Sequence, residues 1–372
     1  MPSPRRLKVG LIGSGLIAQV MHLHHLRELS ELFEVAAICD LSRTVRDSVG
    51  EAYGITRRLE GWEDLLAEPL DAVLILTSGS HADQAIAAAR AGRHVFVEKP
   101  MCFSVNEGIE MVEAARTAGV RLMIGYNKRY DPAYERLQGE LTRLGELRLA
   151  RVTTLESPFQ PYVGHLPLVK GTDVSSDAVA RLRAADDRRI DKALGPVDAP
   201  SRRAYRWVLL DSMVHELNAI RGLLGEPDRL EFADIREHGV TAVLSFGAVH
   251  CIVTWVDLQD GITRYSMEFA LFGPKQRATL EFPSPFLRNA ATLLILEGGE
   301  PGSSRSWETV ETASYEESFK RELEHFHRSI VDGTEPRTAG EDGLRDIALC
   351  QAIVRAHVDR LPVSRPTAGV MP

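Results

Sequence analysis

Residues 7–18, which read Leu-Lys-Val-Gly-Leu-Ile-Gly-Ser-Gly-Leu-Ile-Ala, decide the fold of this chain. The apolar run 7–12 leads into a glycine turn, and a stretch compatible with a helix follows it. This is the G-x-G-x-x-A form of the dinucleotide-binding fingerprint, in the strand–turn–helix setting that the motif requires. The glycines let the backbone turn tightly and approach a pyrophosphate, and N–H groups at the helix start bind the phosphates. The predicted cofactor contacts here are Gly13, Ser14, Gly15, Leu16 and Ile17.

Asp40 identifies the cofactor class more closely. It follows the next apolar run, about 20 residues after the fingerprint, where a carboxylate binds the hydroxyls of the adenosine ribose. Because its charge would repel a 2′-phosphate, the sequence favours NAD over NADP. Arg43, three residues later, offers a partner for such a phosphate, and NADP therefore stays open as the less favoured cofactor.

The composition is that of an ordinary globular protein of more than one domain. The chain has 372 residues, 44% hydrophobic and 26% charged, and a formal net charge of −8. The negative charge argues against nucleic acid or an anionic membrane as a partner. No apolar run is long enough to span a membrane, and the N-terminal run is too short and glycine-rich for a signal peptide. Four scattered cysteines without C-x-x-C spacing complete the expectation of a cytoplasmic protein with free thiols.

The first third of the chain alternates short apolar runs with amphipathic stretches, which predicts a parallel sheet covered by helices. The expected strands are 7–12, 33–39, 71–76, 94–97 and 121–124, and the expected helices are 16–29, 43–53, 81–91 and 104–118. We interpret residues 1–126 as a Rossmann domain that binds NAD(P).

The pattern changes after that point. The expected strands are 240–246, 249–256, 265–271 and 277–282, separated by glycine turns typical of antiparallel connections, and two late helices cover 314–331 and 341–359. The sequence thus predicts an α/β protein, in which residues 127–372 form an α+β domain with a largely antiparallel open sheet for substrate binding and oligomerisation. The last helix is expected to pack back on the first domain.

One stretch, 169–203, is rich in Asp, Arg, Ala and Ser and has few large apolar residues. Two interpretations remain open for this inserted polar segment. It forms a solvated surface helix and loop, or it serves as a lid or subunit contact near the substrate site.

Two elements carry side chains suited to chemistry at an alcohol. Lys99 directly follows the strand 94–97, at the end of a parallel strand where open α/β sheets bind ligands. Asp211 and His215 stand four residues apart in the expected helix 209–224 and share one face. A carboxylate beside an imidazole orients the ring and raises its basicity, as a general base requires. Taken alone, Lys99 is typical of a surface lysine, and Asp211 with His215 is typical of a contact on a surface helix. Their combination predicts a catalytic site.

Together these features resemble the Gfo/Idh/MocA family, named after glucose–fructose oxidoreductase and inositol dehydrogenase. The matching signatures stand in order along nearly the whole chain. They are the fingerprint 13–18, Asp40, the run 91–100 (Ala-Gly-Arg-His-Val-Phe-Val-Glu-Lys-Pro), the segment Asn127-Lys128-Arg129-Tyr130, and Asp211 with His215.

The resemblance implies a Rossmann domain and an α/β domain whose open sheet forms the interface of a homodimer or homotetramer. It also implies hydride transfer between a nicotinamide and a carbon that bears a hydroxyl, with Lys99, Asp211 and His215 as the catalytic set. Besides the fingerprint and Asp40, the cofactor contacts are predicted to be Arg43, Thr77, Ser78, His81, Glu98, Lys99 and Asn127. The predicted substrate contacts are Lys99, Arg129, Tyr162, Asp211 and His215.

The chain departs from the family pattern in two places. Leu76-Thr77-Ser78-Gly79 replaces the usual Thr-Pro before the helix near His81, and bulky residues 205–210 replace a glycine cluster before Asp211. Thr77 and Ser78 can still contact the cofactor. The bulky stretch, together with the inserted segment 169–203, predicts a substrate pocket unlike that of a plain inositol dehydrogenase.

A histidine cluster, His22, His24 and His25, raises the question of a metal. No carboxylate or cysteine at ligand spacing joins these residues, and we therefore predict no metal site.

The leading hypothesis is an NAD-dependent dehydrogenase that oxidises a secondary hydroxyl of a sugar, glycoside or cyclitol. An enzyme that cleaves glycosides by oxidation and elimination, with NAD recycled in place, is a second hypothesis. A non-catalytic regulator that binds the cofactor is a third, less favoured because it has no need of Lys99, Asp211 and His215.

Overall fold

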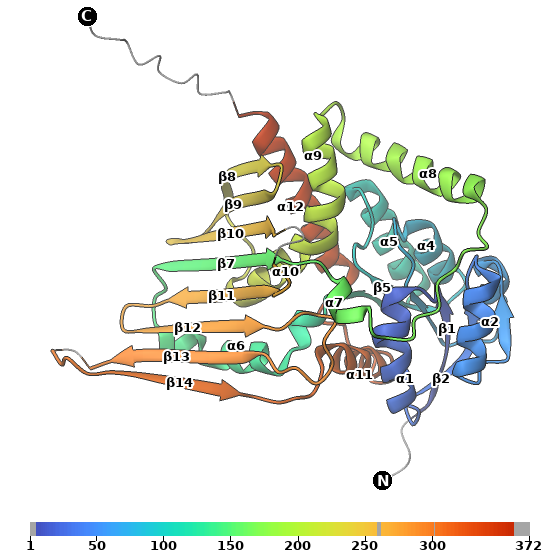
Figure 1. Cartoon of the computed structure of the whole chain (residues 1–372), viewed down its shortest axis with the longest axis horizontal. Helices are drawn as coiled ribbons and strands as arrows, with labels where there is room; N and C mark the ends of the chain where they lie inside the picture. Colours follow the sequence, from blue (N-terminus) through green and yellow to red (C-terminus); the bar gives the residue numbers. More distant parts are fainter. Residues whose placement is uncertain (1–4, 259–261, 301, 361–372) are drawn as a thin grey trace, which may run out of the picture.

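The computed structural model describes residues 5–258, 262–300 and 302–360, which form two β-sheets with helices packed on them (Figure 1). The strands of the first sheet are β1 (Leu7–Ile12), β2 (Phe33–Cys39), β3 (Arg57–Leu59), β4 (Ala72–Ile75), β5 (His94–Glu98) and β6 (Leu122–Gly125). All neighbouring pairs are parallel, in the order β3-β2-β1-β4-β5-β6. The strand order reverses between β1 and β4, where open α/β sheets bind ligands at the carboxyl ends of the strands.

Helices cover this sheet, and every residue of β4 and β6 is buried, as strands covered on both faces require. The helices are η1 (Ala18–His22), α1 (Leu23–Glu28), α2 (Arg43–Ala52), α3 (Trp62–Leu66), α4 (Ala82–Arg90) and α5 (Val105–Ala118). Local sequence sets their ends: Ser104 caps α5 by accepting from the backbone N–H of Glu107, and Gly119 ends it at a φ of +67°. The single helix expected over 16–29 is instead a π-helical turn, η1, followed by α1.

The strands of the second sheet are β7 (Leu149–Glu156), β8 (Arg229–Arg236), β9 (Gly239–Phe246), β10 (Val249–Asp257), β11 (Ser266–Phe272), β12 (Gln276–Phe282), β13 (Leu293–Gly299) and β14 (Ser306–Thr312). The order is β14-β13-β12-β11-β7-β10-β9-β8, and within the described residues β7 and β10 make its parallel pair while the other neighbours are antiparallel. The sheet is therefore mixed and largely antiparallel, as predicted.

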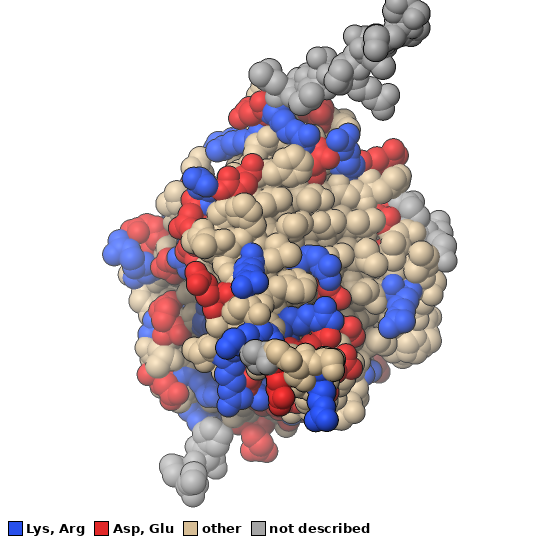
Figure 2. All heavy atoms as spheres, turned by 90° about the vertical axis from the view of Figure 1, so that its left-hand side faces the viewer, with Lys and Arg blue, Asp and Glu red and all other residues tan. Residues whose placement is uncertain are grey.

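In β10, Cys251, Val253 and Trp255 point into the core, and the residues between them are half-buried or exposed. This alternation is expected of a sheet with one face packed on helices. Figure 2 shows the side of the molecule that carries this sheet: uncharged side chains gather over its upper part, and charges of both signs lie beside and below them. Neither sign forms a continuous field on this side.

The helices of this part of the chain are η2 (Asn127–Tyr130), α6 (Pro132–Leu144), α7 (Gln160–Val163), α8 (Ser176–Leu194), α9 (Ala199–Ala204), η3 (Tyr205–Met213), α10 (Val214–Leu224), α11 (Ser318–Val331) and α12 (Gly340–Val358). Within the described residues, no helix is long and apolar enough to cross a membrane. The helix expected over 209–224 is in fact two elements, because η3 has π-helical geometry and α10 begins only at Val214.

The polar segment 169–203 forms an ordered surface element that contains α8 and α9. In α8, Ile190 and Ala193 are the buried residues. Arg189 binds the carboxylates of Asp83, at 2.5 Å, and Glu107, at 3.4 Å. These ion pairs fix α8 to the first turns of α4 and α5 of the same chain, beside which it lies in Figure 1.

The helix α10 is anchored to α12 by a buried ionic network around Arg221. The guanidinium of Arg221 binds Asp346, and it binds Asp342 at 3.1 Å and Glu226 at 2.6 Å. Asn218 donates to Asp342 at 2.6 Å and to Asp346 at 2.7 Å. Burial raises the pKa of Asp346 to about 7, although Arg221 opposes that shift. Asp346 therefore depends on its partners to stay ionised near neutral pH.

Arg221→Met should destabilise the protein strongly, since it leaves the buried carboxylate of Asp346 without its cation. Breaking a buried ion pair from one side typically costs about 3–5 kcal/mol. The measurement is the melting temperature at pH 8, where Asp346 is ionised. Arg229→Met is the matched control, because Arg229 pairs with Glu231 on the surface and its loss should leave the melting temperature unchanged. Equal melting temperatures for the two variants would show that this network does not anchor α10.

Candidate active site at the carboxyl ends of the parallel strands

The turn between β1 and η1 is shaped for the close approach of a ligand. Gly13 has a φ of +91°, and a Cβ atom there would lie 2.9 Å from both the backbone nitrogen and Cγ2 of Thr77. Gly15 has open space where its Cβ would stand, and the hydroxyl of Ser14 is buried without a hydrogen-bond partner. This cradle fits the pyrophosphate of a dinucleotide.

Leu16 and Ile17 follow the turn and are half-buried. They pack in one apolar cluster with Leu166 and Leu168, which belong to the coil between α7 and α8. This coil therefore lies next to the predicted pyrophosphate site.

The Asp40 carboxylate stands beside the glycine turn. One of its oxygens accepts from the backbone N–H of Ser14 and the other from the backbone N–H of Ser42, both at 2.9 Å. The residue is half-buried, so the carboxylate stays within reach of a ribose. Arg43 lies farther out, with its side chain 80% exposed and bound to Asp47 at 3.3 Å.

The loop after β4 holds three predicted cofactor contacts, Thr77, Ser78 and His81. Thr77 donates to Gln84 at 3.2 Å, and Ser78 is exposed. His81, however, is fully buried, and its ring nitrogens lie 2.7 Å from the carbonyl of Thr77 and 2.8 Å from that of Pro100. Burial lowers the pKa of His81, so the neutral ring donates to one carbonyl at a time. His81 thus ties the loop after β4 to the turn at Pro100, and its contact with the cofactor stays a prediction.

Glu98 and His22 support the end of β5 from inside the fold. The Glu98 carboxylate lies 2.6 Å from Nε2 of His22 and accepts from the backbone N–H of Lys99 at 3.0 Å. Burial opposes ionisation of Glu98, yet the partners outweigh it and lower its pKa. In the structure one oxygen of Glu98 binds His22 and the other holds the peptide that carries Lys99, and the contact of Glu98 with the cofactor stays a prediction.

The sequence reasoning missed the carboxylates near the histidine cluster. Glu322 joins His22 and Glu98, and Glu28 joins His24 and His25, because α11 and the following turn of α1 bring them there. Burial and the neighbouring Glu98 raise the pKa of Glu322 well above its usual value. A protonated Glu322 is neutral and needs no cation to balance it in the interior. We therefore assign no metal to the cluster of His22, Glu98 and Glu322.

Lys99 and Asp211 meet at the centre of the site. The ammonium of Lys99 donates to the backbone carbonyl of Asp211 at 2.5 Å and to its carboxylate at 2.9 Å. Burial opposes the charged form of Lys99, but Asp211 and Glu98 outweigh it and raise its pKa. Asp211 was predicted to orient His215; its carboxylate instead pairs with Lys99, since the π-helical turn η3 sets a different spacing from an α-helix.

His215 opens α10, directly after η3, and packs edge-on against the Tyr126 ring with centroids 6.1 Å apart. The residue is half-buried, and its Nδ1 is buried without a hydrogen-bond partner. Burial, then the charges of Lys99 and Lys128, lower the pKa of His215 well below its usual value. The imidazole is therefore neutral at neutral pH and able to accept a proton.

Lys128 and Glu156 line the same region, although the predictions omitted them. Lys128 is buried beneath the site, with its ammonium 4.7 Å from the centroid of the Phe282 ring, and burial lowers its pKa. Glu156 accepts from Ser212 at 3.1 Å, and burial raises its pKa. Lys128 stands in a motif that marked the family resemblance, so this signal was present in the sequence.

Arg129, predicted to contact substrate, belongs to another cluster. Its guanidinium lies 3.4 Å from the side-chain oxygen of Asn218 and 3.6 Å from Asp342, at the anchor between α10 and α12. The adjacent residues Lys128 and Arg129 of η2 thus have different neighbours, and the contact of Arg129 with substrate stays a prediction. Asn127, a predicted cofactor contact, is buried and donates to Ser318 at 3.0 Å.

Tyr162, the remaining predicted substrate contact, lies in α7. Its hydroxyl donates to the carbonyl of Thr263 at 2.7 Å and accepts from the backbone N–H of Tyr265 at 2.9 Å. The side chain thus joins α7 to the start of β11, and its contact with substrate stays a prediction.

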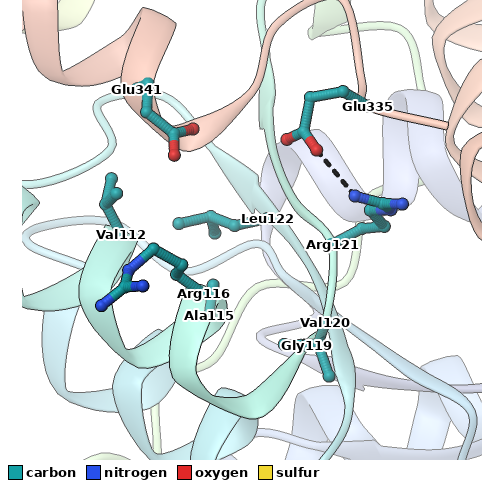
Figure 3. Close-up of a pocket in the computed structure, with 9 residues that line it drawn as sticks. All are labelled: Val112, Ala115, Arg116, Gly119, Val120, Arg121, Leu122, Glu335 and Glu341. Carbon is teal, nitrogen blue, oxygen red and sulfur yellow. Dashed lines mark hydrogen bonds and ion pairs between the residues drawn. The ribbon is translucent and has the colours of Figure 1, made fainter.

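A separate hollow opens at the opposite end of the parallel sheet, between the end of α5, the start of β6 and the start of α12 (Figure 3). Its volume is about 350 Å³, and the salt bridge between Arg121 and Glu335, at 2.7 Å, borders it. Parallel sheets bind ligands at the carboxyl ends of their strands, so we do not place the active site here.

The chain is similar to known oxidoreductases. A family model described as an oxidoreductase family with an NAD-binding Rossmann fold matches residues 7–126. The chain is 23% identical over 372 aligned positions to myo-inositol 2-dehydrogenase of Thermotoga maritima, which covers 96% of this chain and 98% of that protein. It is 24% identical over 362 residues to an uncharacterised oxidoreductase of Bacillus subtilis, YrbE, with 97% of each chain covered.

Two solved structures share the fold over 95% of this chain at 21% identity. One is an oxidoreductase from Agrobacterium radiobacter in complex with NAD+, L-tartaric acid and magnesium, with a TM-score of 0.71 and 96% of that chain covered. The other is a 3-ketoreductase from Actinomadura kijaniata in complex with NADP, with a TM-score of 0.72 and 98% of that chain covered.

The electrostatic assignment of His215 can be tested without any activity. Ring titration followed by NMR should give a pKa for His215 below 6.5, and Lys99→Met should raise it because a nearby positive charge is lost. Lys192→Met removes an exposed lysine of α8 and should leave the His215 titration unchanged. A His215 pKa at or above 6.5 in the unsubstituted protein would contradict this picture of the site.

Proposed function

We propose that the chain is a Gfo/Idh/MocA-type NAD(P)-dependent oxidoreductase and that it oxidises a secondary hydroxyl of a sugar, glycoside or cyclitol with NAD. The observation that carries this proposal is that a charged Lys99 lies near a neutral His215 at the carboxyl ends of the parallel strands. An alcohol dehydrogenation needs one group that takes the hydroxyl proton and one that stabilises the oxygen, and these two residues have those protonation states.

The proposed mechanism divides the work among three side chains. The nicotinamide, when bound, supplies the acceptor for a hydride from the carbon that bears the hydroxyl. His215 accepts the hydroxyl proton as general base. Lys99 donates a hydrogen bond to the oxygen while negative charge develops there. Asp211 holds the ammonium in place through its carboxylate and its backbone carbonyl. In the reverse direction the same groups act as acid and donor.

Features of the surrounding wall support a polyhydroxylated substrate. Two donors, Lys99 and Lys128, lie close enough to His215 to lower its pKa, and an acceptor, Glu156, lies close enough to Lys99 to raise the pKa of that lysine. Sites built to pair with hydroxyl groups discriminate strongly against compounds that lack them. The relatives named as inositol 2-dehydrogenases act, by their names, on a compound of this kind.

We also propose that the molecule works as a homodimer or homotetramer through the half-buried face of the second sheet. Ile252, Thr254 and Val256 of β10 lie on that face. Half-buried residues of this kind provide surface for a second copy of the chain.

Lys99→Ala should reduce turnover by about 10²-fold or more, since it removes the donor that stabilises the developing oxyanion. His215→Ala should remove most activity together with the acid limb of the pH–rate profile in the oxidation direction. That limb belongs below pH 6.5, because the folded pKa of His215 is depressed and activity is lost as pH falls through it. The assay follows NADH absorbance with a panel of inositols, sugars and glycosides.

Binding measurements separate these effects from loss of fold. Both variants should keep the affinity for NAD of the unsubstituted protein, and Lys192→Ala should keep its turnover as well. Near-normal turnover in Lys99→Ala would remove the lysine from the mechanism. An acid limb that persists in His215→Ala would remove the histidine as the base.

NAD should bind more tightly than NADP, because the Asp40 carboxylate meets the adenosine ribose and repels a 2′-phosphate. Asp40→Ser should narrow the difference between the two dissociation constants. Isothermal titration of the free protein with each cofactor measures both. A lower dissociation constant for NADP than for NAD in the unsubstituted protein would refute the assignment and point to Arg43.

A further inference from the structure

The coil of residues 164–175, which we call the strap, lies across the predicted cofactor site. Gln19, in the first helical turn after the glycines, binds Val169 of the strap twice. Its amide nitrogen donates to the Val169 carbonyl at 3.0 Å, and its oxygen accepts from the Val169 N–H at 2.9 Å. The same amide nitrogen lies 2.9 Å from the carbonyl of Ser14 in the fingerprint turn. Figure 1 shows the strap passing in front of α1 and toward α2 before it enters α8.

Farther along the strap, Asp173 reaches the N-terminus of α2. One oxygen of its carboxylate accepts from the backbone N–H of Thr44 at 3.0 Å, and the other accepts from the hydroxyl of Ser42. Ser42 is the N-cap of this ten-residue helix, and its hydroxyl also accepts from the N–H of Val45 at 3.1 Å. These hydrogen bonds lower the pKa of Asp173 to about 2, so the group is an anion.

Asp173 and Asp40 share Ser42 as a partner. Asp40 accepts from the backbone N–H of Ser42, and Asp173 accepts from its hydroxyl. The Asp40 carboxylate is where the ribose 2′-hydroxyl is expected, and a phosphate on that hydroxyl would extend toward the N–H groups at the start of α2. A carboxylate of this chain already fills that anion position.

The fold holds the strap in this place at several points. A Cβ atom on Gly171 would lie 2.6 Å from the hydroxyl of Ser42, so the backbone approaches the cap as closely as a glycine allows. After the strap, α8 is fixed by Arg206, which binds Asp186 at 3.0 Å, and by the pairing of Arg189 with Asp83. The carboxylate is therefore positioned by the surrounding fold.

We propose that Asp173 is a second determinant of cofactor choice, which excludes NADP by occupying the site of its 2′-phosphate. The inference rests on the proposed dinucleotide site and deepens it, since it assigns part of the selectivity to a residue outside the Rossmann domain. Arg43 and Arg46 lie on the same turn of α2, and Arg46 donates to the carbonyl of Asp40 at 3.2 Å. With Asp173 absent, these cations and the N–H of Thr44 form a phosphate site.

Adenosine 2′,5′-bisphosphate and AMP are suitable probes, because they differ by the one phosphate in question. Isothermal titration gives the ratio of their dissociation constants for each protein. The unsubstituted protein should bind AMP more tightly. Asp173→Ser should shift the ratio toward the bisphosphate by about 10-fold or more, which corresponds to about 1.4 kcal/mol. Asp173→Asn keeps the size of the side chain and removes its charge, and it should shift the ratio in the same direction.

Asp177→Ser is the matched control, because it removes an exposed acid in the first turn of α8, four residues away. It should leave the ratio unchanged, and the melting temperatures of all variants show whether they are folded. If AMP binds and neither Asp173 variant changes the ratio, the role of Asp173 is refuted while the cofactor site stands. If neither probe nor NAD binds the unsubstituted protein, the proposed cofactor site itself is wrong, and this inference falls with it.

Discussion

The contact between Lys99 and Asp211 is the interaction on which the site depends, because it joins the two parts of the chain across the cofactor end of the parallel sheet. Lys99 comes from the end of β5, and Asp211 comes from η3, 112 residues later. On one side, Glu98 and His22 fix the peptide of Lys99 from within the first domain. On the other side, the Arg221 network fixes α10, which continues η3. The ammonium stands where these two anchored elements meet.

The polar segment 169–203 shows how a stretch without a core of its own becomes ordered. Individual surface ion pairs contribute little stability. Here several contacts are distributed along the segment. Asp173 accepts hydrogen bonds at the start of α2, Arg189 pairs with acids of α4 and α5, and Arg206 of η3 pairs with carboxylates of α8. The burial of α8 agrees with the interpretation as a surface helix, and its contacts are with the first domain of the same chain. The strap in front of it lies beside the glycine turn, so segment and cofactor site share a border.

Much of the first domain could be predicted from the sequence, because its strands are buried on both faces and read as continuous apolar runs. The bounds of β1 and β2 coincide with the predicted runs for that reason. The strand β7 was missed although it is central to the second sheet. Its residues alternate between buried and half-exposed, and its parallel partner β10 lies about a hundred residues later, so no local turn signal marks the pairing.

The site shows the same division between local and distant information. The glycine turn and Lys99 follow from short patterns with a fixed structural setting. The partner of Asp211 does not follow from a short pattern. The spacing of four residues suggested His215, but in the structure Asp211 pairs with Lys99, which is distant in the sequence. His81 and Arg129 were assigned by their neighbours in sequence, yet buried carbonyls and carboxylates from other elements hold them. A pattern within one segment cannot reveal such partners.

The protonation states of Lys99 and His215 follow from burial and from the charges around them. Burial opposes the charge of Lys99, but Asp211 and Glu98 outweigh it and raise the pKa of Lys99. Burial, and then the positive charge of Lys99, lower the pKa of His215. The pKa values of the two groups are therefore far apart, so that Lys99 is charged and His215 is neutral around neutral pH. Groups whose surroundings separate their pKa values in this way are suited to opposite roles in acid–base chemistry. Asp211, which does not touch the imidazole ring, thus acts on the base through the lysine that it keeps charged.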